Sequence, residues 1–183
     1  MTLCLNSLTD GDASQPLSKA VIAQAIALCE QALVQAPDFA PASEKLVRLL
    51  SEKGDRRAAE KQASKAFSLM PDRRHLRLLH EVRGDNEGKF ISHAMGLAAK
   101  SKQADEGYIA LAEFAIEVGI WASASQALSH LSEAFVPHND YYRIQAAIAA
   151  GLGDEAAHQK ALEQASIAPR AHYWLCQSCG IEA

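Results

Sequence analysis

The sequence predicts an all-α fold, a right-handed α-solenoid of helical hairpins, and three observations predict it. Apolar residues recur at helical spacing along the chain, whereas the strict alternation typical of strands never reaches a useful length. Glycine–aspartate pairs and prolines separate the apolar segments, as they do at helix ends. Three pairs of identical residues are also 34 residues apart: Pro37 with Pro71, Ala25 with Ala59, and Ala32 with Ala66.

A period of 34 residues is that of the tetratricopeptide repeat, a helix–turn–helix unit. One such hairpin cannot bury its own apolar stripe, so consecutive hairpins stack and share a continuous core. The low aromatic fraction, 6%, and the abundance of alanine favour closely packed helices over a sheet. The sequence therefore predicts a row of short hairpins that resemble tetratricopeptide repeats.

The first predicted helix covers residues 18–35 and matches the second helix of a repeat. Its expected partner is missing, because residues 11–16 are polar and turn-forming. The missing partner indicates either a capping helix or a chain cut from a longer array, and of the two we favour the cut. On this division residues 1–16 form a flexible N-terminal tail, residues 17–170 form the solenoid, and residues 171–183 form a C-terminal tail.

Four hairpins are expected after this helix, and the first is the clearest. Leu46 and Leu50 share one face of its first helix, which Gly54 ends because glycine tolerates the left-handed backbone of a helix cap. Pro71 stops the second helix, because proline has no N–H to donate and disfavours helix in the residue before it.

The later hairpins follow the same scheme with weaker patterns. Gly84, Gly119 and Gly153 are each expected to separate the two helices of a hairpin. The expected first helices are 76–82, 108–115 and 142–149, and the expected second helices are 91–99, 124–131 and 157–165.

The inner face of such a solenoid is lined mainly by first helices and forms an extended groove for a peptide or a helix. We therefore expect a protein or peptide partner, on the strength of the architecture rather than of any one side chain. Candidate residues of this partner groove are polar or aromatic positions on first helices: Ser43, Arg48, His75, Tyr108, Glu113, Tyr141 and Arg143.

Composition argues against other classes of protein. The net charge of −4 and the absence of a basic stripe argue against nucleic-acid binding. No run approaches the ~20 apolar residues of a membrane span, so this chain is expected to be soluble. Cys29 lies within an apolar helical pattern and is expected to be a small buried residue.

Cys176 and Cys179 form a C-x-x-C-G pattern with Gly180, which is half of a zinc knuckle. Three interpretations remain open. The pair is half of a zinc ribbon whose other half is absent from this sequence, or it is reduced and carries no metal. Alternatively it binds zinc with His172 as a third ligand, or across a dimer. No other cofactor is expected.

No enzyme pattern is found. The sequence contains no glycine-rich phosphate loop, no G-x-S-x-G and no H-E-x-x-H. Its seven histidines are spread along the chain, and His75 and His80 are five residues apart, so they share a helix face poorly. We therefore expect a non-catalytic protein.

With these segments laid out, residues 36–180 resemble the C-terminal tetratricopeptide domain of the HemY family. Members are membrane-anchored bacterial proteins associated with haem biosynthesis, distinct from the flavin-dependent oxidase of the same name. One departure is the run Asp72-Arg73-Arg74-His75, where many members have His-Pro. The segments that carry the resemblance are 37–42, 58–61 with Pro71, 108–112, 119–124, 153–157 and 174–176.

The resemblance implies a scaffold that binds haem-pathway enzymes, and a parent protein anchored in the bacterial inner membrane. Two alternatives stay open. The cysteine pair is also similar to that of lipopolysaccharide-assembly regulators, which join tetratricopeptide repeats to a rubredoxin-like metal domain. Direct haem or porphyrin binding would instead use a histidine such as His75 or His80 as an axial ligand.

Overall fold

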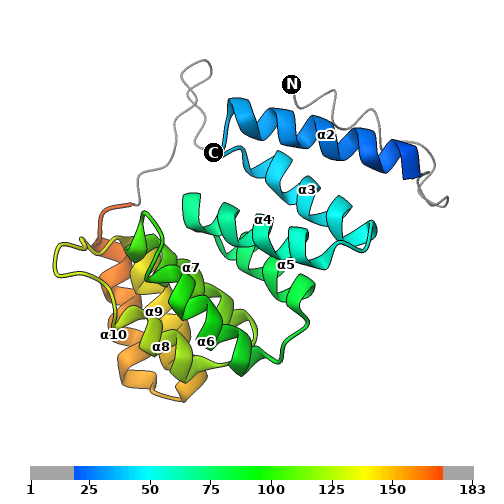
Figure 1. Ribbon diagram of the computed structural model, residues 1–183. Coiled ribbons are helices and arrows are strands. Elements are labelled where there is room, and N and C mark those ends of the chain that lie inside the picture. The colour runs from blue at the N-terminus through cyan, green and yellow to red at the C-terminus, as the bar shows by residue number, and fades with distance from the viewer. Residues whose placement is uncertain (1–18, 171–183) are drawn as a thin grey trace.

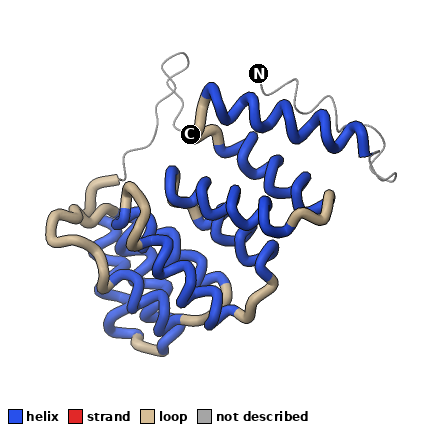
Figure 2. Tube along the Cα trace, viewed as in Figure 1, coloured by secondary structure: helices blue, strands red, loops and turns tan. Residues whose placement is uncertain are grey.

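Residues 19–170 are described by a computed structural model, and this part of the chain is all-α, with nine helices and no strand (Figures 1 and 2). The predicted fold class is confirmed at this level. The predicted tails, residues 1–16 and 171–183, lie outside the described residues. The helices are α2 (Lys19–Gln35), α3 (Ala40–Glu52), α4 (Arg56–Leu69), α5 (Arg73–Arg83), α6 (Glu87–Ala98), α7 (Ala104–Glu117), α8 (Trp121–Leu128), α9 (Asn139–Leu152) and α10 (Glu155–Ile167).

Each helix packs against the next one along the chain, and a second set of contacts joins alternate helices. In that set α3 contacts α5, α5 contacts α7, and α7 contacts α9, while α4 contacts α6. The helices α3, α5, α7 and α9 therefore form a continuous row, and these are the predicted first helices of the four hairpins. Figure 1 shows the chain passing from α2 at one end to α9 and α10 at the other.

The helix ends follow the sequence closely. Gly54, Gly84, Gly119 and Gly153 all have positive φ angles, between 57° and 86°, so each takes the left-handed conformation predicted for it. α4 ends at Leu69, two residues before Pro71.

Side-chain caps explain where several helices begin. Four helices follow an aspartate or asparagine whose carboxylate or amide oxygen accepts a backbone N–H of the first turn. The effect is clearest in α5, which begins three residues before the predicted 76–82, because Asp72 accepts the N–H of Arg74 at 2.7 Å. The four capping residues are Asp55, Asp72, Asn86 and Asp154.

One predicted helix boundary is wrong. The pattern placed Leu131 on the second helix of the third hairpin, but α8 ends at Leu128. Residues 129–138 instead form a loop, which projects at the left of Figure 1. The cause is a tertiary contact, because the carboxylate of Asp105 in α7 accepts both the N–H and the hydroxyl of Ser132, at 2.8 and 2.6 Å.

The core runs through the stack as one cluster of alanine, leucine and phenylalanine side chains. Phe90 and Phe114 meet edge to face with ring centroids 5.1 Å apart, and His80 packs against both rings. Cys29 is fully buried, as predicted, and burial raises the pKa of its thiol.

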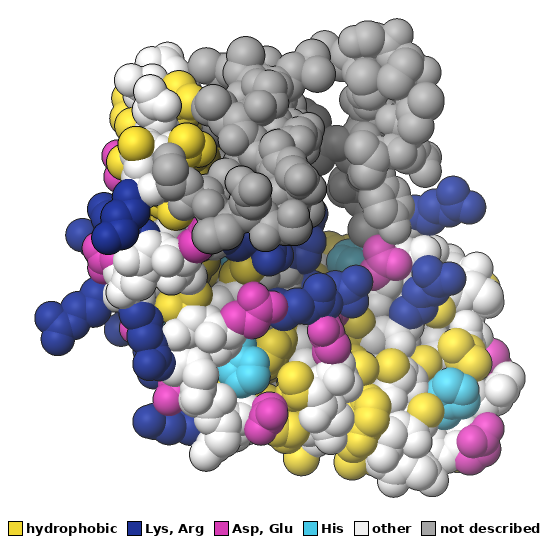
Figure 3. Space-filling model, turned by 90° about the vertical axis from the view of Figure 1, so that its right-hand side faces the viewer, with side chains coloured by type: hydrophobic (Ala, Val, Ile, Leu, Met, Phe, Trp, Pro, Cys, Tyr) yellow, Lys and Arg dark blue, Asp and Glu magenta, His cyan; other side chains and the backbone are white. Residues whose placement is uncertain are grey.

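Acidic and basic side chains are interspersed on the face of the molecule shown in Figure 3. One ion-pair network joins α4, α5 and α6: Arg83 contacts Glu60 and, at 2.7 Å, Asp85, which Lys89 contacts at 3.2 Å. Among residues 19–170, no helix combines the length and the apolar character that a membrane span requires.

Candidate partner-binding surface

Three of the seven predicted groove residues lie inside the packed core. Ser43 is 3% exposed and accepts a hydrogen bond from Gln62 at 3.1 Å. His75 is 2% exposed, with its Nδ1 atom 3.0 Å from the carbonyl oxygen of Met70. Tyr108 is buried and stacks on His130, with ring centroids 5.2 Å apart. These side chains satisfy or cover groups within the chain and are not offered to a partner.

The other four lie at the surface of first helices. Arg48 is exposed on α3, beside a hollow that it lines with Leu78 and Glu81 of α5. Arg143 is exposed on α9 and lies 4.0 Å from Asp140. Tyr141 and Glu113 are partly buried, and both lie beside larger cavities.

A large hollow lies over α7, and we call it the α7 groove. Its volume is about 1030 Å³. α7 forms its floor, Pro71 and Asp72 just before α5 and Asp140 in α9 bound it, and the loop between α8 and α9 forms a wall. Its lining residues are Pro71, Asp72, Lys102–Glu106, Ile109, Ala110, Glu113, Ser132, Ala134–Val136, His138 and Asp140.

The wall of the α7 groove is held in place from both ends. Asp105 fixes Ser132 through the two hydrogen bonds described above. Phe135 packs against Tyr141 and His138, with ring centroids 5.4 and 5.9 Å away. Val136 directly follows Phe135, lines the groove and is 74% exposed. The loop therefore presents an apolar side chain to the groove from a fixed position.

The groove is acidic. Five carboxylates line it, those of Asp72, Asp105, Glu106, Glu113 and Asp140, against one lysine, Lys102. Burial raises the pKa of Glu113, and the neighbouring carboxylates add to that effect, while the charge of Arg73 opposes it. Burial acts in the same direction on Asp72, but hydrogen bonds and charge from Arg74 outweigh it and hold the pKa of Asp72 below its ordinary value.

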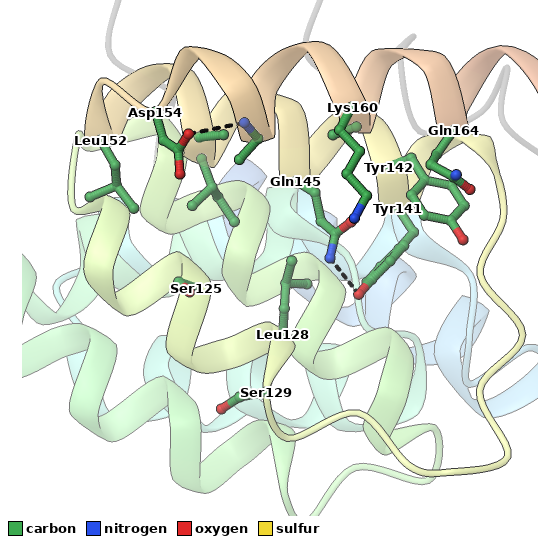
Figure 4. A pocket seen from close by; sticks show the side chains of 14 residues that line it. Ser125, Leu128, Ser129, Tyr141, Tyr142, Gln145, Leu152, Asp154, Lys160 and Gln164 are labelled. Atoms are coloured by element: carbon green, nitrogen blue, oxygen red, sulfur yellow. Dashed lines mark hydrogen bonds between the residues drawn. The ribbon is translucent and has the colours of Figure 1, made fainter.

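A second cavity of about 630 Å³ lies among α8, α9 and α10 (Figure 4). Leu128 and Leu152 give it an apolar side, and Gln145 donates a hydrogen bond to the hydroxyl of Tyr141 at 2.7 Å. Lys160 and Gln164 of α10 line its other side. Its polar groups come from three helices but form no catalytic arrangement such as a nucleophile bonded to a base.

No group of three or more histidine, cysteine, aspartate or glutamate side chains within residues 19–170 is placed to hold a metal ion. The predicted zinc ligands, His172, Cys176 and Cys179, lie outside the described residues, so that site stays a prediction. The two histidines considered as haem ligands both make contacts within the chain. His75 is buried, and the Nε2 atom of His80 lies 3.0 Å from the carbonyl oxygen of Asp85.

The sequence predicted Glu113 as a residue of the partner groove but did not predict the loop of residues 129–138 that forms the wall of the α7 groove. Phe135 and Val136 were overlooked because helical spacing was carried on to Leu131. The connection between α8 and α9, residues 129–138, has ten residues and is longer than a tight hairpin turn.

Comparisons with models of protein families, with curated proteins and with solved structures gave no match to this chain.

Proposed function

We propose that this chain is a right-handed α-solenoid of tetratricopeptide-like hairpins and that it acts as a non-catalytic scaffold for another protein. The observation that carries the proposal is the row α3, α5, α7 and α9 with the α7 groove on it. A hollow of that size, open along a row of helices, suits an extended or helical segment of a partner.

Equivalent burial at repeat-spaced positions supports the solenoid. Ala25 and Ala59, 34 residues apart, are 4% and 0% exposed, and Ala32 and Ala66 are both 6% exposed. Small side chains at these places let α2 and α4 approach their neighbours closely. The same packing position thus recurs at the period of the sequence repeat, as expected when units stack in a line.

The resemblance to the HemY family extends this proposal to the identity of the partner and to the location of the parent protein in the cell. It suggests the tetratricopeptide region of a bacterial inner-membrane protein whose partners are haem-pathway enzymes. His75 is buried with its Nδ1 atom 3.0 Å from the carbonyl oxygen of Met70, and the Nε2 atom of His80 lies 3.0 Å from that of Asp85, so both rings already have contacts within the chain. The proposal is therefore one of protein binding rather than haem binding.

Site-specific photo-crosslinking tests the proposal. A benzophenone amino acid is placed at Arg48 or Arg143 on first helices, and at Lys61 or Glu163 on second helices as exposed controls. Each variant is irradiated in a membrane extract of the source bacterium, and adducts are identified by mass spectrometry. We expect protein adducts from the first-helix positions, with haem-pathway enzymes among them. Adducts of equal yield from both sets, or from neither, would contradict protein binding on this face.

A further inference from the structure

We propose that the α7 groove takes a cationic, amphipathic segment of the partner, in which lysine or arginine side chains flank an aliphatic one. This inference rests on the proposed function, because it names the chemistry of the segment that the scaffold binds. It is carried by the shape of the groove, by an apolar anchor point in its wall and by the charge around that point.

The apolar anchor point is formed by Val136 and Phe135 above the buried floor of Ile109 and Ala110. A single exposed valine is ordinary on a protein surface. This one differs because it lies in a hollow beside an aromatic ring, on a loop fixed by Asp105. An aliphatic side chain entering here would bury apolar surface on both partners, which is the main source of affinity in such contacts.

Charge decides which segment fits. Asp72 is neutralised by Arg74, and Asp105 uses both oxygens on Ser132. Glu106 is exposed and Glu113 is partly buried, and neither makes an ion pair within the described part of the chain. Asp140 has Arg143 4.0 Å away, and Arg73 and Lys102 are the further cations near the groove. Within residues 19–170, Glu106 and Glu113 are therefore the groove carboxylates left with neither an ion pair nor a side-chain hydrogen bond. An acidic segment would be repelled, whereas a basic one would be attracted and oriented.

The position of Glu113 strengthens the case. A carboxylate in a partly buried position loses hydration, and burial accordingly raises its pKa. A lysine or arginine from a partner would restore the lost interaction and would lower that pKa again. Binding is therefore expected to be stronger above the pKa of Glu113, where the carboxylate is charged, and weaker in acid and at high salt.

The dimensions favour a peptide over a small molecule. The α7 groove has about 1030 Å³ and is bounded by α7, α9 and the segments that connect the helices around them, so several side chains fit along it. Its charged groups are distributed from Asp72, just before α5, to Asp140 on α9 rather than gathered round one point. That distribution matches alternate charged side chains of an extended or helical segment.

Fluorescence anisotropy on the whole chain tests the inference with three labelled ten-residue peptides. The first contains lysines flanking leucines, the second has glutamate in place of each lysine, and the third has serine in place of each leucine. We expect the first to bind about tenfold or more tightly than either of the others at low salt. Equal binding of the lysine and glutamate peptides would overturn the inference.

Matched variants locate the binding. E113Q and V136S should each weaken binding of the first peptide by about fivefold, and E113Q should also reduce its salt dependence. E163Q and L162S, an exposed acid and an exposed leucine on α10, are the controls and should leave binding unchanged. Equal losses in the control variants would show a non-specific charge effect and would overturn the assignment to this groove.

Two further outcomes are distinguishable. If crosslinking succeeds from first helices but the lysine peptide does not bind, the scaffold proposal stands and the charge assignment falls. Light scattering at the concentration of the assay tests a second copy of this chain as the occupant. A dimer that E113Q or V136S dissociates would overturn a peptide partner.

Discussion

The indole of Trp121, at the start of α8, lies directly against the backbone of Gly151 in α9. A Cβ atom added at Gly151 would come within 2.2 Å of the ring, so the two helices approach this closely only because the residue is glycine. We expect G151A to lower the free energy of unfolding by about 1–3 kcal/mol, the usual cost of overpacking. Urea denaturation followed by circular dichroism measures the change.

Gly96 in α6 provides the control, because a Cβ there would meet no atom within 4 Å. G96A should instead raise stability by about 0.5–1 kcal/mol, since alanine is the better helix former. If G151A stabilised the chain as G96A does, the close approach of Trp121 would be refuted.

Glu113 links a single carboxyl group to the stability of the whole chain. Because its pKa is raised on folding, the folded chain holds this proton more tightly than the unfolded chain. Stability therefore falls as pH rises from the unfolded pKa of about 4.3 to the folded pKa, and above that the charge is a constant cost. We expect E113Q to raise Tm at pH 7 and to leave it unchanged near pH 4.

The control for this experiment is the same substitution, glutamate to glutamine, at the exposed residue Glu163. E163Q should leave Tm nearly unaltered at both pH values, because substitutions of exposed side chains away from such features have small effects. Thermal scans at pH 4 and pH 7 decide the matter. A lower Tm for E113Q at pH 7 would mean that a favourable partner of this carboxylate outweighs the cost of its burial.

Helical spacing alone does not decide whether a polar side chain is buried or exposed, as three residues show: Ser43, His75 and Tyr108. All three are polar or aromatic and lie on first helices, so the sequence placed them in the partner groove. Each side chain is buried and has a partner that helical spacing does not reveal: Gln62 for Ser43, the carbonyl of Met70 for His75, and His130 for Tyr108. A buried polar group is recognisable only once its partner is known, and that partner is a property of the tertiary structure.

At the scale of elements, helix ends were the most predictable feature. Gly54, Gly84, Gly119 and Gly153 all end a helix as expected, because only glycine takes positive φ without strain. The end of α8 was not predictable in this way. Leu131 fits the helical spacing, and the helix stops before it because Asp105, far away in sequence, binds Ser132. The wall of the α7 groove was missed for the same reason.

α10 buries little of its own side-chain surface, so we expect its N-terminal cap to matter for its stability. Ala161 is the one residue of α10 that is buried, and the helix packs mainly against α9. Asp154 accepts the N–H of Ala157 at 2.9 Å and so satisfies a group that the first turn leaves unpaired. We expect D154A to destabilise α10 by about 1 kcal/mol and to speed the hydrogen exchange of its amides.

D154N is the conservative control, because asparagine caps helices about as well as aspartate. It should restore most of the protection of α10, which hydrogen exchange followed by mass spectrometry of α10 peptides would show. Equal exchange in D154A and the parent chain would mean that packing on α9 alone fixes the start of α10.

At the scale of the whole molecule, each helix mainly contacts those next to it or two places away along the chain. In such a linear stack, stability is approximately a sum of local terms and neighbour contacts, so damage should stay local. The middle is packed most densely: eight residues of α7 are buried, whereas α10 has one. The ends should therefore open more readily than α7.

Two core substitutions test this arrangement. Phe114 of α7 is 2% exposed and touches Phe90 and His80, so F114A should cost about 3–5 kcal/mol and should speed exchange in α5, α6 and α7 together. A161G in α10 should cost about 1 kcal/mol and should speed exchange in α9 and α10, with no change in α2. Native-state hydrogen exchange measures both. If A161G loosened α2 as much as α10, the chain would unfold as one globular unit. A linear stack of hairpins would then be the wrong description, and the scaffold proposal would lose the row of helices on which the α7 groove depends.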